Sequence, residues 1–192
     1  MSYARAGTPS VRWRTWVEQK PILSLFVVGV IATQLGTYFG YVFPAVGLPV
    51  LPWPLYNGIL GTTLADGFNG SAVEGFVVSA DSFFVGHSLH FINGIVFAAL
   101  WGVLFREDAA RFIKNNVLNG MVYAVIMTII SAGLLVPYAY VPNQGYGLFL
   151  FDGPDGWKLP FGILIWHLIY GVFLGLLWNP KRLDDPEFDV VA

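Results

Sequence analysis

The stretch FFVGHSLHFINGIVFAALWGVLF, residues 83–105, decides the fold of this chain. It runs for 23 residues without Asp, Glu, Lys or Arg, which is enough for a helix to cross a bilayer, since roughly 20 apolar residues suffice. Three more stretches have the same character, so the expected spans cover residues 22–43, 83–105, 117–136 and 160–178. The sequence predicts an all-α membrane protein with four transmembrane helices.

Charged residues are rare and lie in blocks between these spans. The 192 residues are 56% hydrophobic and only 11% charged, against about 25% charged in soluble domains. We therefore expect one membrane domain over residues 1–192, with a long outer loop at 44–82 that contains a short surface helix within 61–84. The absence of cysteine excludes disulfides and thiolate chemistry. No basic patch supports nucleic-acid binding.

The basic residues predict the orientation of the chain. Nine of the ten lie before the first span, between the second and third, or after the fourth, and only Lys158 lies in the other two loops. Loops that face the cytoplasm carry the excess of Lys and Arg. This distribution predicts a protein of a cytoplasmic-type (cell inner) membrane with both termini in the cytoplasm.

An internal repeat links the second and fourth spans. HFINGIVFAALW (residues 90–101) and HLIYGVFLGLLW (residues 167–178) share His, Ile, Gly, Leu and Trp without gaps, which favours a duplicated helix hairpin. In each copy the small residues lie within an arc of about 80° that includes the histidine. Because small residues let helices approach closely in lipid, we expect this stripe to pack, either between the second and fourth spans or against other helices. Its small residues are Gly94, Ala98, Gly171 and Gly175.

The histidines are the candidate functional residues. His87, His90 and His167 are the only three, and all lie on these faces. His90 and His167 could ligate a haem b axially, or either could contact a quinone head group. All three together could instead bind copper or zinc. The plainest alternative is an interhelical hydrogen bond to a neighbour such as Asn93 or Tyr170.

The pattern of a span histidine followed four residues later by glycine, in HFINGIVF and HLIYGVFLG, resembles that of small bacterial four-helix integral membrane proteins without an assigned activity. The resemblance covers the second and fourth spans. It implies a four-helix fold in the cytoplasmic membrane and no particular reaction.

The sequence carries no phosphate loop, nucleophile elbow, paired intramembrane carboxylates or zinc-protease signature. We therefore expect no catalytic activity of its own and predict an accessory or structural subunit of a larger membrane complex, in contact with lipid and with other membrane subunits. The alternative is a membrane redox component that binds haem, metal or quinone through the outer-side histidines. A transporter is less favoured because no charged residue marks a path across the membrane.

Overall fold

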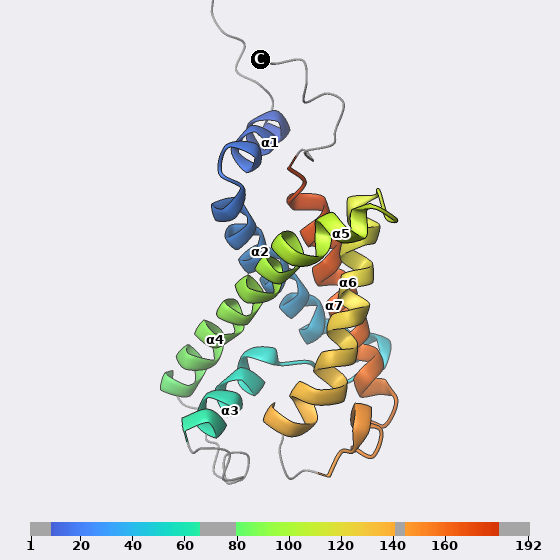
Figure 1. Cartoon of the computed structure of the whole chain (residues 1–192). Coiled ribbons are helices and arrows are strands. Elements are labelled where there is room, and N and C mark those ends of the chain that lie inside the picture. The colour runs from blue at the N-terminus through green and yellow to red at the C-terminus, as the bar shows by residue number, and fades with distance from the viewer. Residues whose placement is uncertain (1–8, 66–79, 141–144, 181–192) are drawn as a thin grey trace, which may run out of the picture.

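The computed structural model describes residues 9–65, 80–140 and 145–180, which form helices and short connections between them (Figure 1). In chain order the helices are α1 (Pro9–Gln19), α2 (Pro21–Val42), η1 (Phe43–Val46), α3 (Trp53–Ala65), α4 (Ala80–Ala99), η2 (Leu100–Phe105), α5 (Arg106–Ala110), α6 (Asn116–Ile130), η3 (Ser131–Tyr140), η4 (Leu148–Leu150) and α7 (Lys158–Leu177). Of these, η2 and η3 are π-helices, whereas η1 and η4 are single 3₁₀ turns.

Four long helices are apolar enough to cross a membrane, as the sequence predicts. They cover Pro21–Val46, Phe83–Ala110, Asn116–Tyr140 and Lys158–Leu177, with mean hydropathy between 1.8 and 2.0. The prediction of an all-α membrane protein with four spans is confirmed. The boundaries differ most at the ends of the second and third spans, which both extend further than expected.

The third span continues beyond residue 136, where the sequence analysis ends it, and passes through a proline. Its helix runs from α6 through η3 to Tyr140, with Pro137 inside. Proline lacks a backbone N–H and its ring clashes with the turn before it. A π-helical turn is wider and bonds one residue further along, so it accommodates both effects. The second span likewise passes from α4 through η2 into α5.

The four long helices pack as two neighbouring pairs. α2 packs on α4, α6 packs on α7, and the pairs meet mainly where α2 contacts α7. Figure 1 shows α1 and the last turn of α7 at one end of the bundle, here called the terminal end. α3 lies at the opposite end, called the α3 end, where it packs on α4 and contacts η3.

Small residues bring the helices of the first pair together. A Cβ added to Gly94 would collide with the Thr33 side chain of α2, and one added to Gly29 would lie 2.9 Å from the Cβ of Ala98. Gly94 and Ala98 therefore pack on α2. Of the two packing arrangements that the sequence allows, the structure has the one in which each stripe faces another helix.

The second pair uses its stripe in the same way. A Cβ on Gly171 would collide with the carbonyl oxygen of Gly120, and one on Gly175 would lie 2.5 Å from the carbonyl oxygen of Asn116. Both clashes are with the backbone of α6. The α6–α7 contact therefore leaves less room for a side chain than the α2–α4 contact does.

The two repeat tryptophans connect the pairs at the terminal end. Trp101 Nε1 donates to Asn119 Oδ1 at 2.9 Å, so α4 is bonded to the start of α6. Trp178 Nε1 donates to the carbonyl of Pro21 at 2.9 Å, so the end of α7 is bonded to the start of α2. The two indole rings also meet edge-on, with centroids 5.7 Å apart. Through its tryptophan, each helix pair is thus hydrogen-bonded to the first helix of the other pair.

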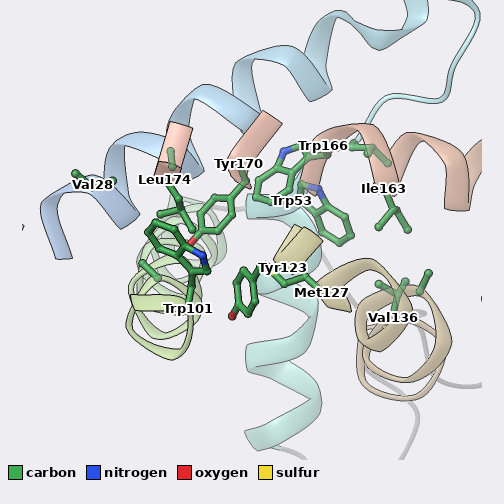
Figure 2. Close-up of a cluster of buried hydrophobic side chains, with 14 of the residues drawn as sticks. Val28, Trp53, Trp101, Tyr123, Met127, Val136, Ile163, Trp166, Tyr170 and Leu174 are labelled. Atoms are coloured by element: carbon green, nitrogen blue, oxygen red, sulfur yellow. The ribbon is translucent and has the colours of Figure 1, made fainter. Parts of the chain in front are cut away.

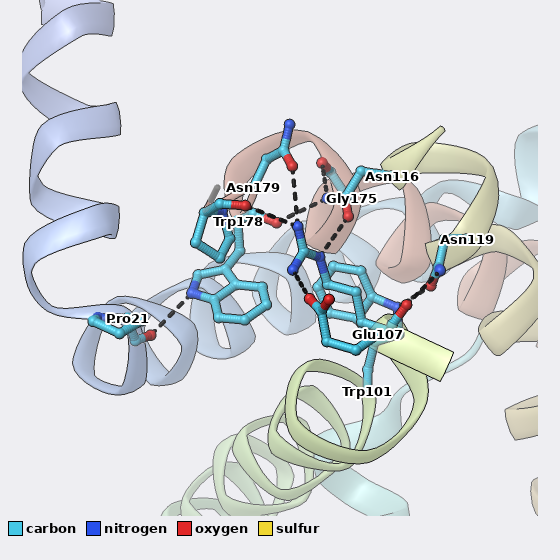
Figure 3. A network of polar contacts seen from close by, with 10 residues as sticks. Pro21, Trp101, Glu107, Asn116, Asn119, Gly175, Trp178 and Asn179 are labelled. Atoms are coloured by element: carbon cyan, nitrogen blue, oxygen red, sulfur yellow. Dashed lines mark hydrogen bonds and ion pairs between the residues drawn. The ribbon is translucent and has the colours of Figure 1, made fainter. Parts of the chain in front are cut away.

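A buried arginine completes the terminal end (Figure 3). Arg106 is 1% exposed, and its Nε donates to Asn116 Oδ1 at 2.7 Å. It also donates to the carbonyl of Pro180 at 2.9 Å, pairs with Glu107, and lies 5.2 Å from the centre of the Trp178 ring. A buried charge is tolerated only when it is paired and hydrogen-bonded. All these partners lie close to one another at one end of the spans, so Arg106 holds those ends together.

The loop after the first span contains a helix, α3, which begins before the stretch that the sequence analysis assigned to a surface helix. α3 begins at Trp53, inside the proline-rich segment, and ends at Ala65. Residues 66–79, which make up most of the stretch expected to carry a surface helix, lie outside the described part of the chain. α3 is also no simple surface helix, because its Asn57 is 1% exposed and points into the bundle.

Candidate functional site

A cavity lies between the two helix pairs and is lined by residues of α2, α3, α4, α6, η3 and α7. The cavity lies about seven residues, or roughly 10 Å along the helix axis, from the α3 end of the second span. The volume of the cavity is about 50 Å³. One water needs about 10–15 Å³, so the cavity has room for several waters or one small molecule.

The walls of the cavity are mainly aromatic and apolar. The Trp166 and Tyr170 rings stack with centroids 5.9 Å apart and planes 10° apart, and Trp53 meets Trp166 edge-on at 6.0 Å. Figure 2 shows these three rings close together between α3 and α7. Phe97, Met127 and Leu135 line the cavity as well. Such walls with a few polar groups are typical of sites for small molecules.

The structure brings two of the three predicted site residues to this cavity. His90 and His167 line it from α4 and α7, and each is only 5% exposed. His87 does not line it; its Nδ1 lies 3.0 Å from the carbonyl of Phe83, one turn earlier in the same helix. Within the described residues no three His, Asp or Glu side chains converge on a position for a metal ion.

Both ring nitrogens of His90 have partners inside the protein. Nε2 lies 2.8 Å from Thr37 Oγ1 of α2, and Nδ1 lies 3.3 Å from Asn57 Nδ2 of α3. The Thr37 hydroxyl donates its hydrogen to the carbonyl of Thr33 at 2.8 Å. It must therefore accept from His90, so Nε2 carries the proton and Nδ1 accepts from the Asn57 amide.

Asn57 is the centre of this polar network. Its amide nitrogen also donates to the carbonyl of Trp53 at 2.8 Å. Its oxygen accepts from Asn93 Nδ2 at 2.6 Å and from the Tyr140 hydroxyl at 3.3 Å. Asn93 Nδ2 further donates to Tyr140 at 3.1 Å. The network connects α2, α3, α4 and η3, and its side chains satisfy most of one another's hydrogen-bonding groups, as burial requires.

His167 has one side-chain hydrogen-bond partner, whereas His90 has two. Its Nδ1 lies 3.1 Å from Thr128 Oγ1 of α6, and that hydroxyl donates to the carbonyl of Ala124 at 2.9 Å. The same reasoning places the proton of His167 on Nδ1. Nε2 then carries a lone pair, and no side chain in the described part of the chain forms a hydrogen bond with it. The two histidines are thus protonated on different nitrogens.

The contacts extend the repeat to the first and third spans, where the sequence match is weak. Gly94 packs on Gly29 and Thr33, and its histidine bonds to Thr37, four residues further along. Gly171 packs on Gly120 and Ala124, and its histidine bonds to Thr128, again four residues further along. Both pairs therefore use the spacing i, i+4, i+8 on the partner helix. This agreement supports a duplicated hairpin.

The geometry is less suited to haem than to a smaller ligand. The lone pair of His90 Nδ1 is already used by Asn57, so iron ligation would break the network centred there. A haem macrocycle is also much larger than a space that holds several waters. The single lone pair of His167 and the aromatic walls fit a small ring-shaped molecule instead.

Several residues of the site were missed by sequence reasoning. Asn57 and Tyr140 come from segments that the sequence analysis assigned to a surface loop and to the region beyond a span. Ser131 and Thr128 lie in the third span without any distinguishing motif. Their only signal was a polar side chain within an apolar stretch, which indicates a buried, functional or packing position without naming its partner.

The chain matches no protein-family model, no curated protein and no solved structure in these comparisons. Inference about its function therefore rests on the cavity itself.

Proposed function

We propose that this protein binds a small, neutral, ring-shaped lipophilic molecule, of the quinone and hydroquinone class, in the cavity between its two helix pairs. One observation carries the proposal. Inside a largely apolar bundle, a cavity with aromatic walls contains a histidine nitrogen, His167 Nε2, that has no side-chain hydrogen-bond partner among the described residues. Polar groups within membrane spans are costly, and they mark ligand sites by default.

Neutrality of the ligand follows from the lining. No Asp, Glu, Lys or Arg is among the residues that line the cavity, all of which the structure describes. A charged ligand would lose its hydration without gaining a counter-charge. A ring that is soluble in lipid meets no such cost, and it can stack on Trp166 and Tyr170.

The test compares two neighbouring residues of η3. Leu135 lines the cavity, whereas Leu134 is 59% exposed on the apolar outer surface. Leu135→Trp should fill the cavity and Leu134→Trp should leave it open. Protein purified gently from native membranes is extracted with organic solvent, and co-purified lipophilic molecules are identified by mass spectrometry. We expect a ring compound with wild type and Leu134→Trp and its loss with Leu135→Trp. Equal recovery from all three proteins would contradict the proposal.

A second candidate function is that of an accessory subunit in a larger membrane complex. It is favoured by the unequal burial of the spans: only 28% of the most apolar window of the second span is buried, against 44–56% for the others. Its outward residues include Phe84 and Val96, at 73% and 48% exposure. Light scattering after gentle solubilisation tests this. A particle that contains other polypeptides supports a subunit, and a lone chain or small homo-oligomer argues against one.

We also propose that the terminal end faces the cytoplasm of a cell inner membrane, as the basic residues predict. The chain has no cysteine, so single cysteines can report the side. A membrane-impermeant maleimide should label Asp152→Cys in intact cells and Arg111→Cys only after permeabilisation. The reverse pattern would invert the topology.

A further inference from the structure

We propose that the cavity selects the hydroquinone form of such a ring over the quinone form, because its free polar groups accept hydrogen bonds. This inference rests on the proposed function and adds the chemical polarity of the ligand. A hydroquinone carries two hydroxyl donors, whereas the corresponding quinone carries only carbonyl acceptors. A cavity lined by hydrogen-bond acceptors should therefore bind the reduced form, which carries the donors.

The first acceptor is His167 Nε2. Its lone pair is fixed in place because the Nδ1 proton is held by Thr128, whose own hydrogen is held by Ala124. The side chain is 5% exposed and lines the cavity. An imidazole that is neutral and protonated on the far nitrogen can only accept at the near one.

The second acceptor is the amide oxygen of Asn93. The amide nitrogen of Asn93 donates to Asn57 Oδ1 and to the Tyr140 hydroxyl, which uses both of its hydrogens. This pattern fixes the amide orientation, so the oxygen is the group left without a partner among the described residues. Asn93 lies on α4, opposite His167 on α7, and both line the same cavity.

Most of the donors that line the cavity are already engaged, and the exceptions among the described residues are the Ser131 hydroxyl and two indole groups. His90 Nε2 donates to Thr37, and Asn57 donates to Trp53 and His90. The hydroxyl of Tyr170 donates to the carbonyl of Gly94 at 2.6 Å, and that of Tyr140 donates to Asn57. Ser131, whose hydroxyl can donate or accept, is compatible with either form of the ring.

Two indole groups need separate consideration. Neither Trp53 Nε1 nor Trp166 Nε1 has a hydrogen-bond partner in the described part of the chain, and both atoms are enclosed by protein. Trp166 Nε1 is directed at α2, where it lies 3.1 Å from the position that a Cβ on Gly36 would take. A molecule in the cavity therefore does not contact these donors in this arrangement of the rings. The polar groups that a molecule in the cavity can reach are therefore mainly hydrogen-bond acceptors.

The experiment uses three ligands of one shape: tetramethylhydroquinone, its oxidised quinone and its dimethyl ether, which has no donor. Each is titrated anaerobically into the purified full-length protein in detergent, and binding is measured by calorimetry. We expect the hydroquinone to bind about tenfold more tightly than either analogue, the factor that one net hydrogen bond contributes. This comparison needs no variant, so it does not depend on whether a mutant folds.

Two variants then assign the preference. His167→Phe keeps the ring shape but removes one of the two acceptors, and it should reduce the preference for the hydroquinone. His87→Phe is the matched control outside the cavity and should keep the tenfold preference. In wild type the nitrogen-15 resonance of the unprotonated His167 Nε2 should shift on adding the hydroquinone and stay in place with the ether.

The outcomes separate the two proposals. Equal or tighter binding of the quinone, or equal binding of the ether, overturns the preference and leaves a ring-binding cavity in place. A preference that is undiminished in His167→Phe overturns the role of His167. If none of the three ligands binds wild-type protein, both this inference and the proposed quinone-class function fail.

Discussion

The same repeat position has different surroundings in the two halves of the molecule. His90 and His167 are both followed by Gly at the fourth residue and Trp at the eleventh, and each bonds to a threonine of the partner helix. His90 Nε2 is the protonated nitrogen and its Nδ1 is taken by Asn57. In His167 the proton lies on Nδ1 and the other nitrogen is open to the cavity.

The difference originates in the connections, not in the spans. The first pair has α3 between its helices, and α3 supplies Asn57 to the free side of the His90 ring. In the described part of the second connection, residues 145–157, the helical element is the single turn η4. No side chain from there reaches His167. One histidine thus holds helices together, while its counterpart has a nitrogen left for chemistry.

The largest effect should come from filling the small-residue contacts. Gly171→Ala forces a Cβ onto the backbone carbonyl of Gly120, whereas in Gly94→Ala the clash is with the Thr33 side chain, whose Cβ would lie 2.9 Å away. Overpacking costs about 1–3 kcal/mol, and we expect about 3 kcal/mol for Gly171→Ala and about 1 kcal/mol for Gly94→Ala. Denaturant unfolding in mixed micelles measures both. Gly162→Ala, whose Cβ would have 3.7 Å to its nearest neighbour, is the control with no loss.

The histidines themselves should differ next. His90→Phe removes the acceptor of one Asn57 amide hydrogen and the donor to Thr37 Oγ1 inside the bundle, so we expect a loss of about 2 kcal/mol in the free energy of unfolding. His167→Phe removes one interhelical bond and should cost about 0.6–1 kcal/mol. The same unfolding assay applies. A larger loss for His167→Phe would reverse the assignment of structural and chemical roles.

A smaller effect is expected where the halves are alike. Trp101→Phe and Trp178→Phe each remove an indole hydrogen bond at the terminal end and keep most of the ring contact. Both should cost about 1 kcal/mol, within error of each other. Thermal unfolding of the two variants side by side checks this. Clearly unequal losses would mean that the two terminal-end contacts are not equivalent.

The most sensitive comparison concerns only a proton position. In protein labelled with nitrogen-15 histidine, on a His87→Phe background, one ring should be protonated at Nε2 and the other at Nδ1. His90→Phe should remove the first set of signals and His167→Phe the second. Two rings with the same tautomer would contradict the hydrogen-bond assignment, whatever the stabilities show.

The sequence pattern predicted the helices and packing stripes around the site, but not which polar side chains contact one another inside it. The four spans and the small-residue stripes follow from local composition, because lipid excludes charge and close helices exclude side chains. The partners of the histidines did not follow. Asn93 and Tyr170 were the expected examples, and the actual ones are Thr37, Asn57 and Thr128. A hydrogen bond between helices depends on their rotation and axial shift, which a single sequence does not encode locally.

The sequence by itself determined that this is a helical protein with four spans, since hydrophobic length and the placement of charges are properties of each segment alone. Only the tertiary structure decided that each stripe packs within its own pair, that the third span passes Pro137, and that α3 enters the bundle. Only the tertiary structure decided that His167 Nε2 has no side-chain hydrogen-bond partner among the described residues. These features arise from contacts between distant segments, where the position of one side chain is set by what another helix places beside it.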